Sequence, residues 1–222
     1  MFLADTKLRC KFTEGSLRKN MQSFLFKSRN PVREMLGQIV LVISVFVAIL
    51  YPFGILPFNP ILVKGSAVGL LAIYALLRVS SFDHLLLVIA LLAGAVGDMQ
   101  LEIQLPDAFV SGLKNFLVGH IFYIIIFWRN RLDAFEVSRS RMNVASLLWV
   151  AAAVGTIWLW PSIVDGKFHL AAYAIGILGM ATAALISRYP LKLVGTGAIL
   201  FIASDALIGA DLLFLIQDWV MY

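Results

Sequence analysis

Seven long apolar segments limit what this chain can fold into. Each is close to the roughly 17 to 25 residues that a helix needs to cross a lipid bilayer. The breaks between them are rich in proline, serine or charge, which are typical signals for the end of a helix. We place the segments at about 36–56, 61–78, 84–103, 110–128, 143–160, 169–187 and 193–216. The chain therefore predicts an all-α fold, a polytopic transmembrane helix bundle of about seven spans.

The composition excludes several other kinds of protein. Hydrophobic residues make up 61% of the 222 residues and charged residues only 14%, against roughly 25% charged residues in soluble domains. The single cysteine, Cys10, cannot form an internal disulfide, and with three histidines we expect no protein-built metal site. The chain has no Gly-x-Ser-x-Gly, phosphate-loop or HExxH motif, so the corresponding enzyme classes lack support.

The positive charge follows a topology pattern, not one expected for a nucleic-acid partner. Residues 1–35 predict a basic N-terminal tail without the features of a signal peptide, and residues 36–222 predict the transmembrane domain. Most of the 18 lysines and arginines lie in this tail or in alternate breaks, and only Lys64, Lys114 and Lys167 fall toward the other side. The positive-inside rule then predicts a cytoplasmic N-terminus and, for an odd number of spans, a C-terminus across the membrane. In a bacterium this membrane would be the inner, or plasma, membrane.

Polar side chains inside the apolar segments are the site candidates. An unpaired charge at such a position costs at least about 2.5 to 3.5 kcal/mol, so these groups need partners or water. Counted from the flanking cytoplasmic residues at a rise of about 1.5 Å per residue, five of them share a level near 20 Å. They are Lys64, Asp98, Asn115, Tyr173 and Asp205. Their common level predicts one polar pocket.

Two further observations refine this prediction. His120 lies nearer the cytoplasmic side, at roughly 14 Å, where we interpret it as a hydrogen-bonded packing residue and not as a base. Glycines beside the common level, including Gly65 and Gly97, predict close approach of the helix backbones. For Asp98 or Asp205 alone, a structural ion pair with Lys64 explains the charge as well as a catalytic role does.

Several short motifs coincide with these polar residues. They are Lys64 at the start of the second span, Gly97-Asp98 near the end of the third, FLVGHIFY at 116–123, YAIGILGMATAAL at 173–185 and GAILFIASD at 197–205. In combination, over about residues 40–216, they resemble the YhhN-like lysoplasmalogenases. Gly65 departs from the family pattern, which usually has proline at that position.

The resemblance implies an integral-membrane hydrolase that acts on a lysophospholipid. The reaction would cleave the vinyl ether bond of a lysoplasmalogen and release a fatty aldehyde and glycerophosphoethanolamine or glycerophosphocholine. Acid-catalysed cleavage of this bond needs a protonated carboxyl group and a second carboxylate, and Asp98 and Asp205 are the catalytic candidates. Lys64 would hold one of them ionised, and Lys64, Asn115, His120 and Tyr173 are the candidates for substrate binding. This chemistry requires no metal and no organic cofactor.

Questions of assembly and class stay open at this point. The family normally has an eighth span after the helix that carries Asp205, so we expect the chain, which ends at Tyr222, to lack the last span. A homodimer would cover the flank left open. A small membrane transporter or a non-catalytic membrane scaffold would also carry charged residues and glycines inside its spans, although no inverted repeat is evident.

Overall fold

The computed structural model describes residues 31–103, 105, 107–159 and 167–207 of the chain. Within these residues the fold consists of helices and contains no β-sheet, which confirms the all-α prediction. Six helices are long and apolar enough to cross a membrane, and they begin and end close to six of the expected spans. The expected seventh span is described as far as residue 207. The tail before residue 31 and the expected absence of an eighth span concern parts of the chain outside the described residues.

The helices follow one another with short connections. The first, α2, begins at Pro31, earlier than the expected start at 36, and runs to Leu50. The others are the short turn η1 (Tyr51–Phe53), α3 (Pro60–Leu77), α4 (Phe82–Leu101), α5 (Ala108–Arg129), α6 (Arg139–Leu159), α7 (Lys167–Leu185) and the π-helical turn η3 (Leu191–Gly195). A helix over residues 196–207 continues directly from η3.

Side-chain caps explain why α3 and α4 start where they do. The Asn59 side chain accepts a hydrogen bond from the Ile61 amide at 2.9 Å, and Pro60 occupies the first turn of α3, where a missing N–H costs nothing. Ser81 caps α4 by accepting from the His84 amide at 3.3 Å. The proline and serine breaks in the sequence therefore act as helix starts as well as helix ends.

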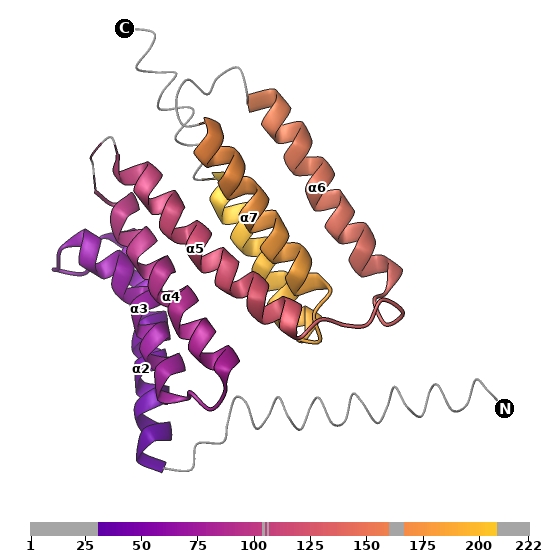
Figure 1. Ribbon diagram of the computed structural model, residues 1–222. Helices are drawn as coiled ribbons and strands as arrows, with labels where there is room; N and C mark the ends of the chain where they lie inside the picture. The colour runs from indigo at the N-terminus through magenta and orange to yellow at the C-terminus, as the bar shows by residue number, and fades with distance from the viewer. Residues whose placement is uncertain (1–30, 104, 106, 160–166, 208–222) are drawn as a thin grey trace, which may run out of the picture.

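The α4 helix lies at the centre of the first part of the bundle. It packs against both α3 and α5, α2 packs on the other side of α3, and α5 also packs against α7 (Figure 1). The α6 helix makes a looser contact with α7 and stands at the edge of the view. Large apolar side chains such as Val42, Phe46 and Leu147 are exposed on the outside of the helices, as expected where lipid is the solvent.

Glycines allow close contact at the helix interfaces. A Cβ atom added to Gly97 of α4 would lie 2.9 Å from the Phe116 ring of α5, and one added to Gly65 of α3 would collide with Met99 of α4. These contacts confirm the predicted close approach at both positions. They also bring the ends of α3, α4 and α5 that carry polar side chains close together.

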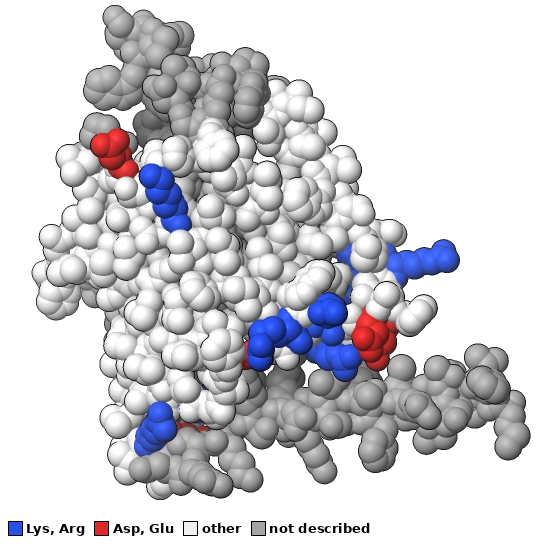
Figure 2. All heavy atoms as spheres, viewed as in Figure 1, with Lys and Arg blue, Asp and Glu red and all other residues white. Residues whose placement is uncertain are grey.

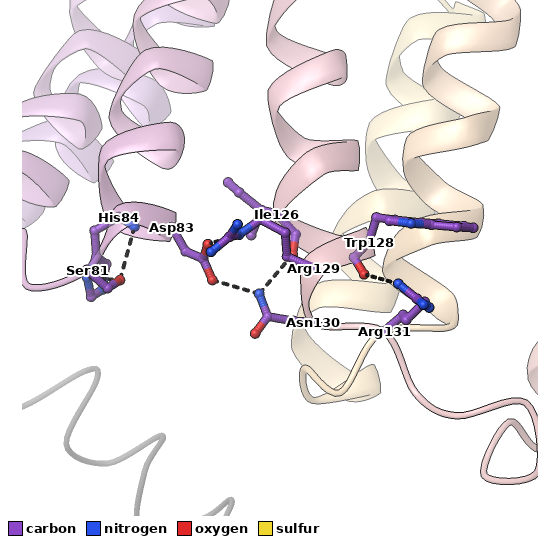
Figure 3. A network of polar contacts seen from close by, with 8 residues as sticks. All are labelled: Ser81, Asp83, His84, Ile126, Trp128, Arg129, Asn130 and Arg131. Atoms are coloured by element: carbon purple, nitrogen blue, oxygen red, sulfur yellow. Dashed lines mark hydrogen bonds and ion pairs between the residues drawn. The ribbon is translucent and has the colours of Figure 1, made fainter.

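One end of the bundle is tied by a polar network, which we call the basic end. Asp83, in the first turn of α4, accepts from Arg129 Nε and from Asn130 Nδ2, both at 2.8 Å, so it joins the start of α4 to the end of α5 (Figure 3). Arg188 joins this network through its backbone amide, which donates to the Asn130 carbonyl at 2.8 Å, and its side chain pairs with Asp133 at 3.3 Å. Figure 2 shows most of the lysine and arginine side chains of the visible face in the same lower half of the molecule. The structure thus places the cations of alternate breaks at one end, and the direction of that end in a membrane stays a prediction.

Candidate active site

Three of the predicted site residues form one hydrogen-bonded chain. The Tyr173 hydroxyl of α7 donates to Asp205 Oδ2 in the helix over 196–207. His120 Nε2 of α5 lies 3.3 Å from the same hydroxyl, and the two rings are 5.4 Å apart. His120 and Tyr173 are almost fully buried, with 2% and 7% of their surface exposed. These hydrogen bonds join residues that are 53 and 32 positions apart in the sequence.

With Asp205 ionised, these hydrogen bonds place a proton on His120 Nε2. A hydroxyl group has one proton, and Tyr173 uses it for Asp205. His120 Nε2 therefore donates to the Tyr173 oxygen, and in the neutral ring Nδ1 is left as an acceptor. Nδ1 is buried and has no hydrogen-bond partner within the described part of the chain. The Phe201 ring packs edge-on against the imidazole, with centroids 5.4 Å apart, and fixes its plane.

Asp98 of α4 interacts with charged groups of two other helices. Its carboxyl group interacts electrostatically with Lys64 of α3 and with Asp205, and its charge also acts on Tyr173. No side chain in the described residues donates a hydrogen bond to it, in contrast to Asp205. The two predicted carboxylates therefore come from different helices, interact with each other, and differ in their hydrogen bonding.

Lys64 forms a different ion pair from the one expected. Its Nζ atom donates to Glu102 Oε2 at 3.1 Å and lies 5.7 Å from the centre of the Tyr51 ring. The Tyr51 hydroxyl donates to the same Glu102 oxygen at 2.5 Å. The pKa of Glu102 is lowered, first by the hydrogen bond from Tyr51 and then by Lys64, against the opposing effect of burial. Glu102 follows α4 by one residue, so a long lysine side chain reaches it beyond Asp98.

Asn115 is held by α4 rather than by either aspartate. Its Nδ2 atom donates to Gln100 Oε1 at 2.7 Å and to the Ser111 carbonyl at 3.0 Å. Gln100 thus accepts a hydrogen bond from the Asn115 amide group, which was predicted to bind substrate. The Asn115 side chain also has a carbonyl oxygen, Oδ1, which accepts no hydrogen bond from the described residues.

Sequence reasoning found six of these residues and missed three. Tyr51, Gln100 and Glu102 take part in the polar contacts but were not among the predicted site residues. Glu102 had a usable signal, because it is an acidic residue directly after a helix that carries Asp98. Tyr51 had a weaker one, since it stands at a break and its hydroxyl reaches Glu102 only through the turn η1. Among the described residues, no three side chains of histidine, cysteine, aspartate or glutamate come together as metal ligands.

Comparison with known proteins gives a consistent result. The family model described as "YhhN family" matches residues 59–221. Two curated proteins named lysoplasmalogenase, from Mycobacterium bovis and Mycobacterium tuberculosis, are each 34% identical to this chain over 151 residues. That match covers 66% of this chain and 57% of each relative, so the chain spans little more than half the length of the curated relatives it matches. No solved structure matches the chain.

Proposed function

We infer the function from one premise: this chain belongs to the YhhN family. We propose that it is a multi-pass integral-membrane hydrolase of the lysoplasmalogenase type. Its substrate would be a lysophospholipid with a vinyl ether bond, and its products a fatty aldehyde and glycerophosphoethanolamine or glycerophosphocholine. The curated relatives named lysoplasmalogenase support this substrate class.

The observation that carries the proposal is the carboxylate pair Asp98 and Asp205. Two acidic side chains from separate helices interact electrostatically in a bundle whose helices expose many large apolar side chains. Burying such groups is unfavourable, so a pair of them is a functional candidate by default. Neither forms the ion pair with Lys64 that a purely structural role would favour, because Lys64 is paired with Glu102.

Their different surroundings suggest different roles in the reaction. A hydrogen bond from a neutral donor stabilises the ionised form of a carboxylate, so Asp205, which accepts from Tyr173, serves as the carboxylate. Asp98, which lacks such a donor among the described residues, serves as the acid. The Tyr173 hydroxyl and the His120 ring hold Asp205 in place.

The reaction then balances with water alone. Asp98 gives its proton to the vinyl carbon that is not bonded to the ether oxygen. The product is an oxocarbenium ion that faces Asp205. Asp205 takes a proton from a water molecule as that water adds to the cationic carbon. The resulting hemiacetal then breaks its carbon–oxygen bond to the glycerol. Asp205 gives its proton to the departing glycerol oxygen, and Asp98 takes the proton of the hemiacetal hydroxyl group. These transfers give the aldehyde and the free hydroxyl group of the glycerophospho-base, and they return both carboxyl groups to their starting states. This division of labour between two carboxyl groups is the one used in glycoside hydrolysis.

A test compares carboxyl-to-amide variants. The full chain, purified in detergent, is assayed for aldehyde release from a lysoplasmalogen, alongside Asp98→Asn, Asp205→Asn and the control Asp107→Asn at the exposed start of α5. We expect the first two variants to lose at least about 10²-fold in kcat, the usual range for removal of an acid or base, and the control to keep full activity. Full activity in either of the first two would refute the paired-carboxylate mechanism. Solute flux in liposomes without aldehyde would favour a transporter, and neither activity would favour a scaffold.

A further inference from the structure

The end of the bundle opposite the basic end carries a partly exposed charged pair, Lys64 and Glu102. The α4 helix begins at the basic end with Asp83 in its first turn, and Glu102 directly follows its last residue at the other end. Lys64, near the start of the neighbouring α3, donates to Glu102 Oε2 at 3.1 Å. The side chain of Lys64 is 25% exposed and that of Glu102 is 27% exposed. Molecules outside the bundle can therefore reach both charges.

Both residues keep hydrogen-bonding capacity that the described part of the chain does not use. A lysine ammonium group has three N–H donors, and Lys64 directs one of them to Glu102. Tyr51 and Lys64 both donate to Oε2 of Glu102, whereas Oε1 accepts no hydrogen bond from the described residues. Within those residues the buried polar atoms without a partner belong to Arg78 and His120, so part of the surface of Oε1 is open. The pair thus offers donors and an acceptor to a ligand.

The pair lies about one helical turn from Asp98, the proposed acid. Asp98 and Glu102 are four positions apart, which places them on one face of α4 and about 6 Å apart along its axis. Lys64 interacts electrostatically with both carboxyl groups, and α3 and α4 run side by side (Figure 1). Glu102 stands at the end of the helix, so Asp98 is the deeper of the two. From this end of the bundle inward, the charged pair comes first and the acid second.

A lysophospholipid presents its groups in the same order. In a bilayer the phosphate and ammonium groups lie in the polar surface layer, and the carbon chain lies in the hydrocarbon core. The glycerol carbons separate the phosphate from the ether oxygen, a span comparable with one helical turn of about 5.4 Å. A lipid whose vinyl ether bond meets Asp98 therefore brings its head group to Lys64 and Glu102.

The charges of the pair match those of a zwitterionic head group. A lysine ammonium group binds phosphate as a point charge, and a carboxylate attracts an ammonium group. A head group with a phosphate and no ammonium group would place a negative charge beside Glu102 without compensation. Such a repulsive contact is a common source of specificity, because it weakens binding of the wrong ligand. The pair therefore distinguishes zwitterionic from purely anionic lysophospholipids.

We propose that Lys64 binds the phosphate and Glu102 the ammonium group of the lysophospholipid head group, so that Glu102 selects ethanolamine or choline head groups over anionic ones. The Tyr51 hydroxyl holds Glu102 through Oε2 and leaves Oε1 available for the ligand. This inference rests on the proposed function for the class of lipid. It adds to the site a specificity-determining residue, Glu102, that does not take part in the proposed reaction.

The first test measures binding without the reaction. Saturated ether lysolipids keep the carbon chain, the glycerol and the head group but lack the vinyl bond, so the proposed reaction does not cleave them. The two probes are the hexadecyl ether of glycerophosphoethanolamine and the hexadecyl ether of glycerophosphate. Each is added to the full chain in detergent, and the rise in Tm reports binding. We expect the wild type to need about tenfold less of the ethanolamine probe for half of the maximal rise.

Two variants assign the roles of the pair. Glu102→Gln keeps the size of the side chain and removes its charge, so we expect about tenfold weaker binding of the ethanolamine probe and a change below about twofold for the phosphate probe. Lys64→Gln removes the phosphate contact, so we expect it to weaken both probes alike. Asp107→Asn is the matched control, since it removes an exposed carboxylate from the connection that follows α4, and we expect it to bind like the wild type.

The wild-type comparison is decisive even if a variant does not fold. Equal binding of the two probes by the wild type, or no rise in Tm with either, would overturn the proposal. An unchanged preference in Glu102→Gln, an equal loss for both probes in that variant, or the same loss in Asp107→Asn would also overturn it. Unchanged binding in Lys64→Gln would refute the phosphate contact.

Aldehyde release from a lysoplasmalogen, measured on the same preparations, separates this inference from the proposed function. A Glu102-dependent preference without aldehyde release would keep the head-group site and refute the reaction. Aldehyde release without any preference between the probes would keep the reaction and refute the head-group site.

Discussion

The Tyr173 hydroxyl donates to Asp205 while it accepts from His120, so one oxygen atom joins α5, α7 and the helix over 196–207. Tyr173→Phe removes both hydrogen bonds and keeps the ring. We expect a fall in kcat of about ten- to a hundredfold, the effect of losing a hydrogen bond to a charged group, with a smaller change in KM. The rate of aldehyde release at increasing substrate concentrations measures both kcat and KM.

A matched variant separates this effect from general packing. Tyr123→Phe changes a tyrosine of α5 that stacks on Phe127 with centroids 6.2 Å apart. We expect it to retain wild-type turnover. Equal losses in the two variants would mean that the Tyr173 hydroxyl has no special part in the site.

Glu102 and its two hydrogen-bond donors, Tyr51 and Lys64, form what we call the Glu102 cluster. This cluster predicts that the stability of the fold changes in acid. The pKa of Glu102 is lowered in the folded chain by Tyr51 and Lys64, so ionised Glu102 stabilises the fold above its ordinary value of 4.5. This contribution is lost as the pH falls from 4.5 through the lowered pKa of Glu102 in the folded chain. We expect the Tm of the wild type to drop between about pH 6.5 and about pH 3.5 by more than the Tm of Glu102→Gln does. Parallel curves for the two proteins would contradict the linkage, and Asp107→Asn is the control that should follow the wild type.

Gly97 offers a direct test of helix packing. A Cβ atom at this position would lie 2.9 Å from the Phe116 ring, so Gly97→Ala forces α4 and α5 apart. We expect a loss of about 1 to 3 kcal/mol in the free energy of unfolding, as for other overpacked interiors. Gly197→Ala is the control, because a methyl group added there would meet nothing within 4 Å and alanine favours a helix. Thermal unfolding compares them, and equal stability of the two variants would contradict the close α4–α5 contact.

Orientation in the membrane is a separate prediction. The cations at the basic end predict that this end faces the cytoplasm. After Cys10 is replaced by serine, single cysteines are introduced at Phe58, in the exposed connection before α3, and at Ser138, in the connection before α6. We expect a membrane-impermeant maleimide to label position 58 in intact cells and position 138 only after lysis. The reverse pattern would invert the topology.

The sequence predicted the spans well because their signals are local. Apolar length, Pro60 and Ser81 are enough to locate α3 and α4, and no distant contact is needed. Residue counting also gave useful depths, because the rise along a helix is nearly constant. It correctly suggested that Tyr173 and Asp205 lie at one level, and the structure joins them by a hydrogen bond.

Partners were harder to predict than depths. Counting along a helix does not give the direction of a side chain around it, nor its reach. Lys64 lies at the level of Asp98 by count, yet its long side chain reaches Glu102 instead. His120 was placed several ångströms below Tyr173, but two long side chains on packed helices close that gap. Tyr51 was missed because its position depends on the short turn that follows α2.

The hydrogen bond from Tyr51 to Glu102 joins a residue outside the family match to a residue inside it. The family model matches the chain from residue 59 to residue 221, whereas Tyr51 lies before that match, in the turn η1 that follows α2. The carboxylate pair and its neighbours on α5 and α7 all lie inside that match. A chimaera that exchanged α2 together with the turn η1 would therefore keep Asp98, Asp205 and Tyr173 while it replaced the Tyr51 hydroxyl that donates to Glu102. Properties that depend on the contacts of Glu102 with Tyr51 and Lys64 are thus separable, by exchange of this one segment, from those that depend on Asp98 and Asp205.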